Sequence, residues 1–123
     1  MHLRVLVVED DPDSLELMIY LFRAFGHEAL GAASGDTALG VAAAATPDLI
    51  LCDLRLPGMD GFELLSRFKA DPGTRSIPVV AVTAYAMPGD RERVMGAGFD
   101  GYVSKPIDPQ SFVREAEALS ARR

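Results

Sequence analysis

The sequence is poor in the residues that form disulfides and bind soft metals, with one cysteine and two histidines among 123 residues. Cys52 lies in an apolar run and has no second cysteine to pair with, which excludes an intramolecular disulfide and predicts a small core residue. Neither His2 nor His27 has another histidine or a cysteine at ligand spacing, and Gly26-His27 is typical of a helix that gives way to a strand. Zinc and disulfide chemistry are therefore not expected.

Long apolar runs are also missing. No segment approaches the roughly 18 unbroken apolar residues that indicate a membrane span. The first residues, Met1 to Val5, lead directly into an apolar strand pattern and lack the charged, apolar and small-residue zones of a signal peptide. We therefore expect a cytoplasmic protein that does not enter the membrane.

Basic residues are in the minority: 12 Lys and Arg against 18 Asp and Glu give a formal net charge of −6. The only tight basic group is Arg122-Arg123 at the chain end, so no basic stripe could follow a phosphate backbone, and direct binding to nucleic acid is not expected. The balance of 49% apolar and 24% charged residues is that of a globular protein. The length suits one hydrophobic core, and we predict a single domain over residues 1–123.

Apolar, β-branched runs alternate with helical patterns along the chain. Residues 3–8 form a short, mostly apolar and β-branched run, which is typical of a strand buried on both faces. A helix begins at Asp11-Pro12, where Asp11 can cap and Pro12 suits the first helical position, and Gly26 ends it. Further strands are predicted at residues 28–33, 48–53, 78–83 and 101–105. Further helices are predicted at 34–45 and 90–97, around Leu64, Leu65 and Phe68 before a break at residues 71–73, and around Phe112, Ala116 and Leu119.

The resulting order is (βα)₅, without an internal repeat, a linker or a low-complexity tract to divide it. Strands that alternate with helices require right-handed crossovers, which place the helices on both faces of the sheet. The sequence therefore predicts an α/β fold with a mostly parallel sheet.

Polar residues follow four of the predicted strands. The first strand ends at Glu9-Asp10, the third at Asp53, the fourth at Thr83 and the fifth at Lys105. In open α/β sheets, ligands bind outside the carboxyl ends of the strands, where the strand order reverses. A single Asp or Thr at a strand end is more often a turn or cap residue, and a lysine before proline is often a solvated loop residue. Together, these five residues predict one site.

The chemistry that this site supports is specific. Three neighbouring carboxylates repel one another by about 4 kcal/mol per close pair at an effective dielectric of about 20, so a cation is needed. Mg²⁺, or Mn²⁺, prefers hard oxygen ligands, which suits Asp10 and Asp53, with Glu9 acting mainly through water. Such a metal offsets the charge that keeps an anionic phosphoryl donor away. Lys105 adds a point charge, and the Thr83 hydroxyl a hydrogen bond, for phosphate oxygens.

In these segments the sequence resembles the receiver domains of response regulators in two-component phosphorelays, and the resemblance covers essentially the whole chain. The similar segments are residues 5–11, 48–54, 56–61, 82–84 and 101–106. Residues 83–91 are similar to receivers of hybrid histidine kinases and of stand-alone relay proteins. The resemblance implies a flavodoxin-like, doubly wound fold whose five parallel strands lie in the order 2-1-3-4-5.

The resemblance also implies roles for individual residues. Asp53 is the expected phosphoacceptor, and the donor is the phosphohistidine of a sensor histidine kinase or of a histidine phosphotransfer protein. The metal shell would consist of Glu9, Asp10, Asp53 and the backbone carbonyl of Arg55. Thr83 and Lys105 would bind the phosphoryl group. Such a domain is a signalling module rather than an enzyme, although it takes part in its own phosphorylation and slow autodephosphorylation.

A conformational switch is implied in the same way. Thr83 would move toward the phosphoryl group, and Tyr102 would turn into the vacated space; without the family, Tyr102 is better explained as a half-buried strand tyrosine. The signal would appear on the outer face of the fourth helix, fifth strand and fifth helix, for a downstream protein or an output domain. The fourth helix has Val94 and Met95 as its apolar anchors and contains Gly96, so it should shift easily, although its charges also fit an ordinary solvated face.

Two positions tune the lifetime of the acyl phosphate in this family, and here Arg55 and Tyr85 occupy them. Both side chains are bulky. We hypothesise that they hinder the attacking water and prolong the phosphorylated state, although Arg55 could instead point to solvent or contact the partner.

Three alternatives compete with the receiver interpretation. A phosphohydrolase of the haloacid dehalogenase type would carry a second Asp two residues after its nucleophile, where this chain has Arg55. An FMN-binding flavodoxin would need a phosphate-binding first loop, which Glu9-Asp10-Asp11 would repel. A receiver-like module that is never phosphorylated would be expected to lack one of the site residues, and all are present. We expect a stand-alone receiver, because the chain starts at Met1 and stops just after the last helix, and a monomer or weak dimer.

Overall fold

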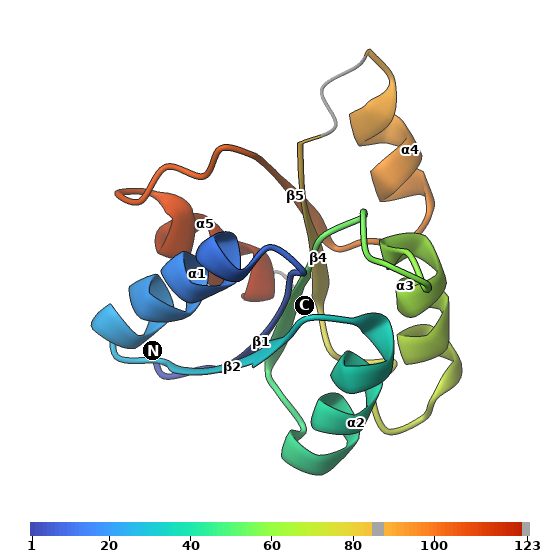
Figure 1. Ribbon diagram of the computed structural model, residues 1–123, viewed down its shortest axis with the longest axis horizontal. Helices are drawn as coiled ribbons and strands as arrows, with labels where there is room; N and C mark the ends of the chain where they lie inside the picture. Colours follow the sequence, from blue (N-terminus) through green and yellow to red (C-terminus); the bar gives the residue numbers. More distant parts are fainter. Residues whose placement is uncertain (85–87, 122–123) are drawn as a thin grey trace.

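The computed structural model describes residues 1–84 and 88–121, in which five strands alternate with five helices (Figure 1). The strands are β1 (Arg4–Val8), β2 (Glu28–Ala32), β3 (Leu49–Cys52), β4 (Val79–Thr83) and β5 (Gly101–Ser104). The helices are α1 (Pro12–Ala24), α2 (Gly35–Ala45), α3 (Gly61–Ala70), α4 (Asp90–Gly96) and α5 (Phe112–Ser120). The predicted element order is confirmed, and the predicted strands run at most one residue too far at either end.

All neighbouring strands are parallel and lie in the order β2-β1-β3-β4-β5. The implied flavodoxin-like, doubly wound topology is therefore confirmed. The strand order reverses between β1 and β3: the chain leaves β1 toward β2 at one edge and, from β3 onward, builds toward the other edge. Because β1 and β3 are direct neighbours, their carboxyl ends meet at this reversal.

The core consists of two apolar layers, one on each face of the sheet. On one face, α1 and α5 pack their aromatic rings together, with the centroids of Phe22 and Phe112 5.4 Å apart. On the other face, α2, α3 and α4 cover the sheet with side chains such as Leu64, Phe68 and Val94. Figure 1 shows this division, with α1 and α5 on one side of the strands and α2, α3 and α4 on the other. The central strands are buried on both faces, which explains why their sequences are almost entirely apolar.

Local sequence signals position the helix starts. The Asp11 carboxylate accepts a hydrogen bond from the Ser14 N–H at 3.2 Å, and Pro12 is the first residue of α1, both as predicted. Asp60 caps α3 in the same way, accepting from the Glu63 N–H at 2.9 Å. Each of these caps begins a helix directly after the loop that follows a strand, so Asp11 and Asp60 define where the loops after β1 and β3 end.

The helix α4 is attached differently. It has seven residues, its cap residue is Gly89 with a φ of 90°, and it has no side-chain capping hydrogen bond. Val94 is its buried side chain, whereas Met95 is 39% exposed. The prediction that Met95 is an apolar anchor is therefore wrong, because Met95 lies on the solvent side of the helix.

His27 has a structural role that its local sequence does not indicate. This side chain is fully buried and its two ring nitrogens are both bonded. Nδ1 accepts from the Leu3 N–H at 3.0 Å, so the ring proton is on Nε2, which donates to the Glu117 carboxylate at 2.6 Å. His27, in the loop before β2, thereby connects the segment before β1 with α5.

None of the helices within residues 1–84 and 88–121 combines the length and the apolar character that a membrane crossing requires.

We expect Glu117→Ala to lower the free energy of unfolding by about 1–3 kcal/mol, because it leaves the buried His27 Nε2–H without its acceptor. Glu117→Gln retains an acceptor and should cost less. Arg67→Ala is the matched control, since it breaks an exposed ion pair with Glu63 and should change stability by less than about 0.5 kcal/mol. Urea denaturation measures all three; equal losses for Glu117→Ala and Arg67→Ala would contradict the role of His27.

Candidate functional site

The site is built where β1 and β3 end side by side. Val8 and Cys52 are paired in register as the last residues of these two strands. Glu9 and Asp53 follow them directly, and the Asp53 N–H donates to the Val8 carbonyl at 3.0 Å. The topology therefore brings two carboxylates, 44 positions apart in sequence, to the point where the strand order reverses.

Asp10 completes a cluster of three carboxylates. One oxygen of each of Glu9, Asp10 and Asp53 lies within 4.8 Å of the others. Glu9 is 1% exposed and Asp53 7% exposed, whereas Asp10 is exposed. Hard oxygen donors at this spacing suit Mg²⁺ or Mn²⁺, and the exposed Asp10 leaves the cluster open to solvent and to an incoming ion.

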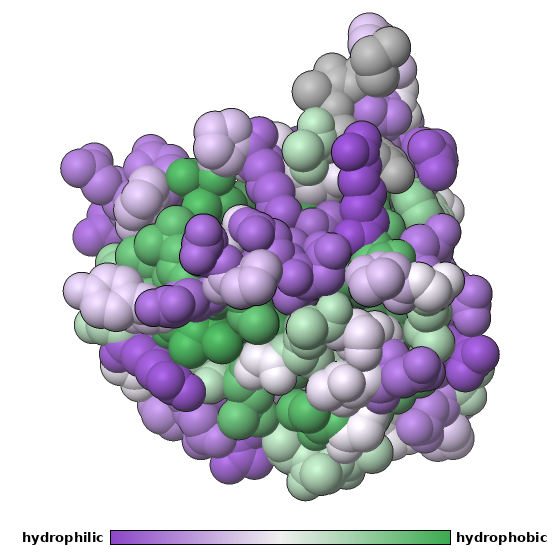
Figure 2. Space-filling view, in the orientation of Figure 1, coloured by the Kyte–Doolittle hydropathy of each residue, from purple (hydrophilic) through white to green (hydrophobic). Residues whose placement is uncertain are grey.

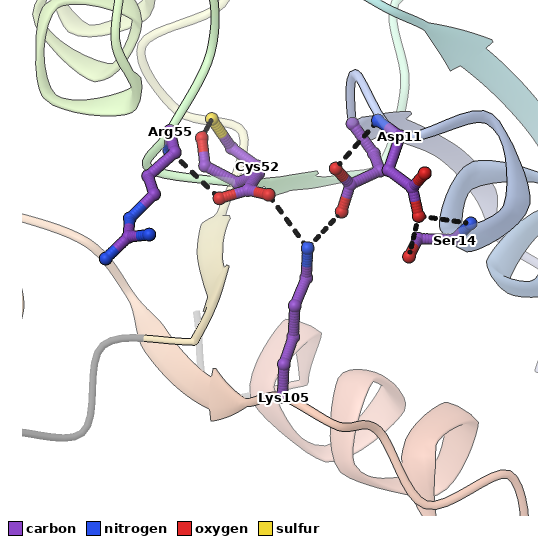
Figure 3. Close-up of polar contacts among 7 residues, drawn as sticks. Asp11, Ser14, Cys52, Arg55 and Lys105 are labelled. Atoms are coloured by element: carbon purple, nitrogen blue, oxygen red, sulfur yellow. Dashed lines mark hydrogen bonds and ion pairs between the residues drawn. The ribbon is translucent and has the colours of Figure 1, made fainter.

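Lys105 binds two members of the cluster. Its Nζ donates to Asp53 Oδ2 at 2.8 Å and also to Glu9 Oε1, as Figure 3 shows. Lys105 follows β5, and β4 lies between β5 and β3, so the long lysine stem is needed to reach the acids. The sequence analysis expected Lys105 to bind phosphate and Glu9 to act through water, and the direct pair between them was not foreseen.

The ionisation of the buried pair reflects this arrangement. Burial raises the pKa of Glu9, and the hydrogen bond from Lys105 only partly opposes that effect. Burial alone would lower the pKa of Lys105, but its hydrogen bonds to Asp53 and Glu9 outweigh burial and raise it. The lysine therefore remains an ammonium ion and compensates part of the negative charge of the cluster.

The loop after β3 holds the Asp53 carboxylate in place. Asp53 Oδ1 accepts from the Arg55 backbone N–H at 2.9 Å, while the Arg55 side chain is exposed. The Gly61 N–H donates to the Leu54 carbonyl at 3.0 Å, and a Cβ at Gly61 would lie 2.7 Å from the Asp53 carbonyl oxygen. The loop can fold back this closely only because residue 61 is a glycine.

Thr83 lies on β4, next to the strand that ends at Asp53, and Tyr102 lies on β5, one strand further away. Thr83 is the last residue of β4 and is fully buried, and its carbonyl accepts from the Lys105 N–H at 2.9 Å. Tyr102 lies on β5 opposite Ala81 and is half-buried. Tyr85, the other expected tuning residue, lies outside the described residues.

Cys52 has the role expected of a small core residue. Its thiol is buried and lies 3.2 Å from the Asp53 carbonyl oxygen. Burial, and next the negative charge of Asp53, raise the pKa of the thiol far above its usual range. Cys52 is thus an unreactive neighbour of the site rather than a nucleophile.

Comparison with known proteins decides the family. A family model described as the response regulator receiver domain matches residues 5–117. This chain belongs to the response regulator receiver domains. The receiver domain is 43% identical over 109 residues to the polar-differentiation response regulator DivK of Brucella ovis, covering 89% of each chain.

Solved structures of receiver domains share its fold. The receiver domain of a sensor histidine kinase from Pseudomonas aeruginosa PAO1 is 30% identical, with a TM-score of 0.87 and coverage of 98% of this chain and 99% of that one. That structure contains a magnesium ion coordinated in its active site cleft. The signal receiver domain of a histidine kinase from Syntrophus aciditrophicus is 28% identical, with a TM-score of 0.86 and coverage of 97% and 90%. The protein is therefore a phosphorelay signalling domain, and the phosphohydrolase and flavodoxin alternatives are set aside.

We expect Asp10→Asn to stabilise the receiver domain by about 1 kcal/mol in the presence of EDTA, because it removes one exposed charge from a mutually repelling cluster. With Mg²⁺, the wild type should instead be more stable than Asp10→Asn. At ten times its dissociation constant the ion stabilises the wild type by about 1.4 kcal/mol, and the variant should lose most of this gain. Thermal unfolding with and without Mg²⁺ measures both effects.

Glu16→Gln is the control for this prediction, because it removes one exposed negative charge from α1 outside the cluster. Its response to Mg²⁺ should equal that of the wild type. A loss of stability for Asp10→Asn in EDTA, or an undiminished response to Mg²⁺, would contradict the proposed electrostatic origin.

Proposed function

We propose that this receiver domain accepts a phosphoryl group on Asp53 from the phosphohistidine of a sensor histidine kinase or of a histidine phosphotransfer protein. The observation that carries the proposal is the position of the Asp53 carboxylate at the reversal of strand order, with two further carboxylates within 4.8 Å and Lys105 Nζ 2.8 Å from its Oδ2. An Asp53 oxygen forms a bond to phosphorus while the phosphorus–nitrogen bond of the donor breaks. The imidazole then remains on the donor protein.

The donor histidine belongs to another protein. His27 is buried with both nitrogens bonded, and it precedes β2, at the amino-terminal edge of the sheet. The ring of His2 lies next to it, with the two centroids 6.5 Å apart. Both histidines are therefore at the edge opposite to Asp53, and a partner must bring the phosphohistidine to the carboxyl edge.

We assign the metal shell to Glu9, Asp10, Asp53 and the backbone carbonyl of Arg55. Carboxylate oxygens within 4.8 Å of one another are the hard donors that Mg²⁺ or Mn²⁺ prefers, with Glu9 acting mainly through water. When bound, such an ion supplies the positive charge that permits an anionic donor to approach and that stabilises the transferred group.

Lys105 has the donors needed to serve both the carboxylate and the phosphoryl group. Its ammonium carries three N–H groups, and the raised pKa keeps it charged. In the proposed reaction, Lys105 exchanges one of its present acceptors for a phosphoryl oxygen, and the Thr83 hydroxyl donates to another. Because the lysine stem is flexible, this exchange does not require β5 to move.

Beside Lys105 there is a surface on which the donor protein could pack. A cavity of about 340 Å³ is lined by Ser14, Leu17, Met18, Ala84, Lys105, Pro106 and Ile107. Figure 2 shows apolar surface alongside α1, and Leu17 is 40% exposed there. We propose that apolar side chains of the donor bind this cavity, since it adjoins the lysine that contacts Asp53.

The proposed output is conformational. The domain is a signalling module that is phosphorylated once and slowly loses the phosphoryl group, rather than an enzyme that turns over a separate substrate. Thr83 moves toward the phosphoryl group, Tyr102 turns inward, and the face formed by α4, β5 and α5 presents the change to a downstream protein or an output domain. The proposed state in solution is a monomer or a weak dimer.

Incubation with phosphoramidate and Mg²⁺ should add one phosphoryl group to the protein, detected by intact mass. Asp53→Asn or removal of the metal with EDTA should abolish the addition, because the first removes the nucleophile and the second leaves the carboxylate charge uncompensated. Asp60→Asn is the matched control, since this exposed residue lies in the same loop and asparagine also caps helices. Phosphorylation of Asp53→Asn would contradict the assignment.

The bulk of Arg55 and Tyr85 is expected to prolong the acyl phosphate by hindering the attacking water. The double variant Arg55→Ala, Tyr85→Ala should lose its phosphoryl group faster, by up to about tenfold, which corresponds to about 1.4 kcal/mol in the barrier. The measurement is the decay of the phosphorylated mass after removal of the donor. An unchanged or slower decay would refute this role.

A further inference from the structure

Besides burying Val94, the short helix α4 contacts two aromatic rings of neighbouring elements through arginine side chains. The guanidinium group of Arg91 lies 5.8 Å from the centre of the Tyr102 ring on β5. That of Arg93 lies 4.8 Å from the centre of the Phe62 ring on α3. Both distances are within the range of a cation–π interaction. The helix is thus tied to β5 by one contact and to α3 by the other.

The two contacts differ in the surroundings of the aromatic ring that each arginine meets. Phe62 and Tyr102 are both half-buried against the same core cluster, but the Phe62 ring also packs edge-on against the buried Phe99, with the centroids 5.8 Å apart. Tyr102 is half-buried, and together with Arg91 it lines a groove of about 600 Å³ between α4, β5 and α5. Arg91 therefore contacts a ring that stands at the open surface of the output face.

We propose that Arg91 is a positioning residue that holds Tyr102 in its outward orientation and so restrains the switch until Asp53 is phosphorylated. The inference rests on the proposed function, in which Tyr102 turns inward. An inward turn takes the ring away from the Arg91 guanidinium, so the contact exists only in the unphosphorylated state. Arg93 keeps its contact with Phe62 in both states and does not take part in the restraint.

The expected size of the effect follows from the type of contact. A cation–π interaction at an exposed site shifts a two-state equilibrium by about two- to fivefold. Loss of the Arg91 contact should therefore raise the inward population of Tyr102 by this factor. Because coupling between two sites is reciprocal, phosphorylation of Asp53 should also free the end of α4 that carries Arg91.

Fluorine NMR of protein labelled with 3-fluorotyrosine tests the proposal on the full chain. The chain has three tyrosines, so Tyr20→Phe and Tyr85→Phe leave the Tyr102 resonance assigned. Adding Mg²⁺ and beryllium fluoride, an analogue of the phosphoryl group, gives the Tyr102 resonance position of the activated state. Without the analogue, Arg91→Ala should move the Tyr102 resonance toward that position, while Arg91→Lys, which keeps a cation, should restore most of the wild-type position.

Arg93→Ala is the matched control, because it removes the other contact of α4 without touching Tyr102. It should leave the Tyr102 resonance near the wild-type position. The same variants also give a kinetic measurement: Arg91→Ala should be phosphorylated by phosphoramidate about two- to fivefold faster than the wild type, and Arg93→Ala at the wild-type rate. Both arginines are exposed, so the variants should remain folded.

The outcomes separate this inference from the proposed function. If Arg91→Ala and Arg93→Ala affect Tyr102 and the phosphorylation rate equally, or if neither has an effect, the positioning role is overturned while Asp53 remains a valid acceptor. If wild-type protein neither gains a phosphoryl group nor responds to beryllium fluoride, the proposed function itself fails. The positioning role is supported if the Tyr102 resonance shifts in Arg91→Ala but not in Arg93→Ala, returns toward the wild-type position in Arg91→Lys, and Arg91→Ala is also phosphorylated faster.

Discussion

The mutual repulsion of three carboxylates at the ends of β1 and β3 is the constraint on which the rest of this receiver domain depends. Glu9 and Asp53 are buried there, and buried carboxylates are costly unless they are compensated. Lys105 provides one positive charge from the other side of β4. A single ammonium does not balance three acids, so the cluster keeps an excess of negative charge and of hard oxygen donors, which suits a divalent cation.

The fold explains how such a cluster is tolerated. The central strands are buried on both faces, and two apolar layers hold them in register, so the strand ends cannot separate to relieve the repulsion. Caps at Asp11 and Asp60 and the close approach at Gly61 define the surrounding loops. The stability of the apolar layers thus maintains an arrangement of charges that is unfavourable by itself and useful for phosphoryl transfer.

The attachment of α4 has the opposite character. The short helix α4 has one buried side chain, Val94, and its Arg91 and Arg93 contact aromatic rings on β5 and α3. Segments with few buried contacts open and shift at low cost in free energy. The domain thus combines a rigidly held group of carboxylates at the strand ends with a weakly held helix on one face of the sheet.

Much of the fold and of the site was predictable from the sequence, because both depend on local patterns. Apolar runs, capping residues and the (βα)₅ order indicate the elements, and residues at the carboxyl ends of parallel strands must share one edge of the sheet. The element boundaries and the grouping of Glu9, Asp10 and Asp53 agree with those patterns. Recognition of the family motifs supplied the strand order, which periodicity alone does not specify.

The features that sequence reasoning missed depend on contacts between distant segments. Nothing near His27 indicates that its ring accepts from Leu3 and donates to Glu117, and nothing near Met95 indicates which side of α4 faces solvent. The direct bond from Lys105 to Glu9 likewise depends on how far the lysine reaches across β4. By itself, the sequence determined which elements form and which chemical groups stand at the strand ends, because these follow from local periodicity and chain direction. Only the tertiary structure decided which of these groups bond to one another, because hydrogen bonds and ion pairs require atomic distances that packing alone defines.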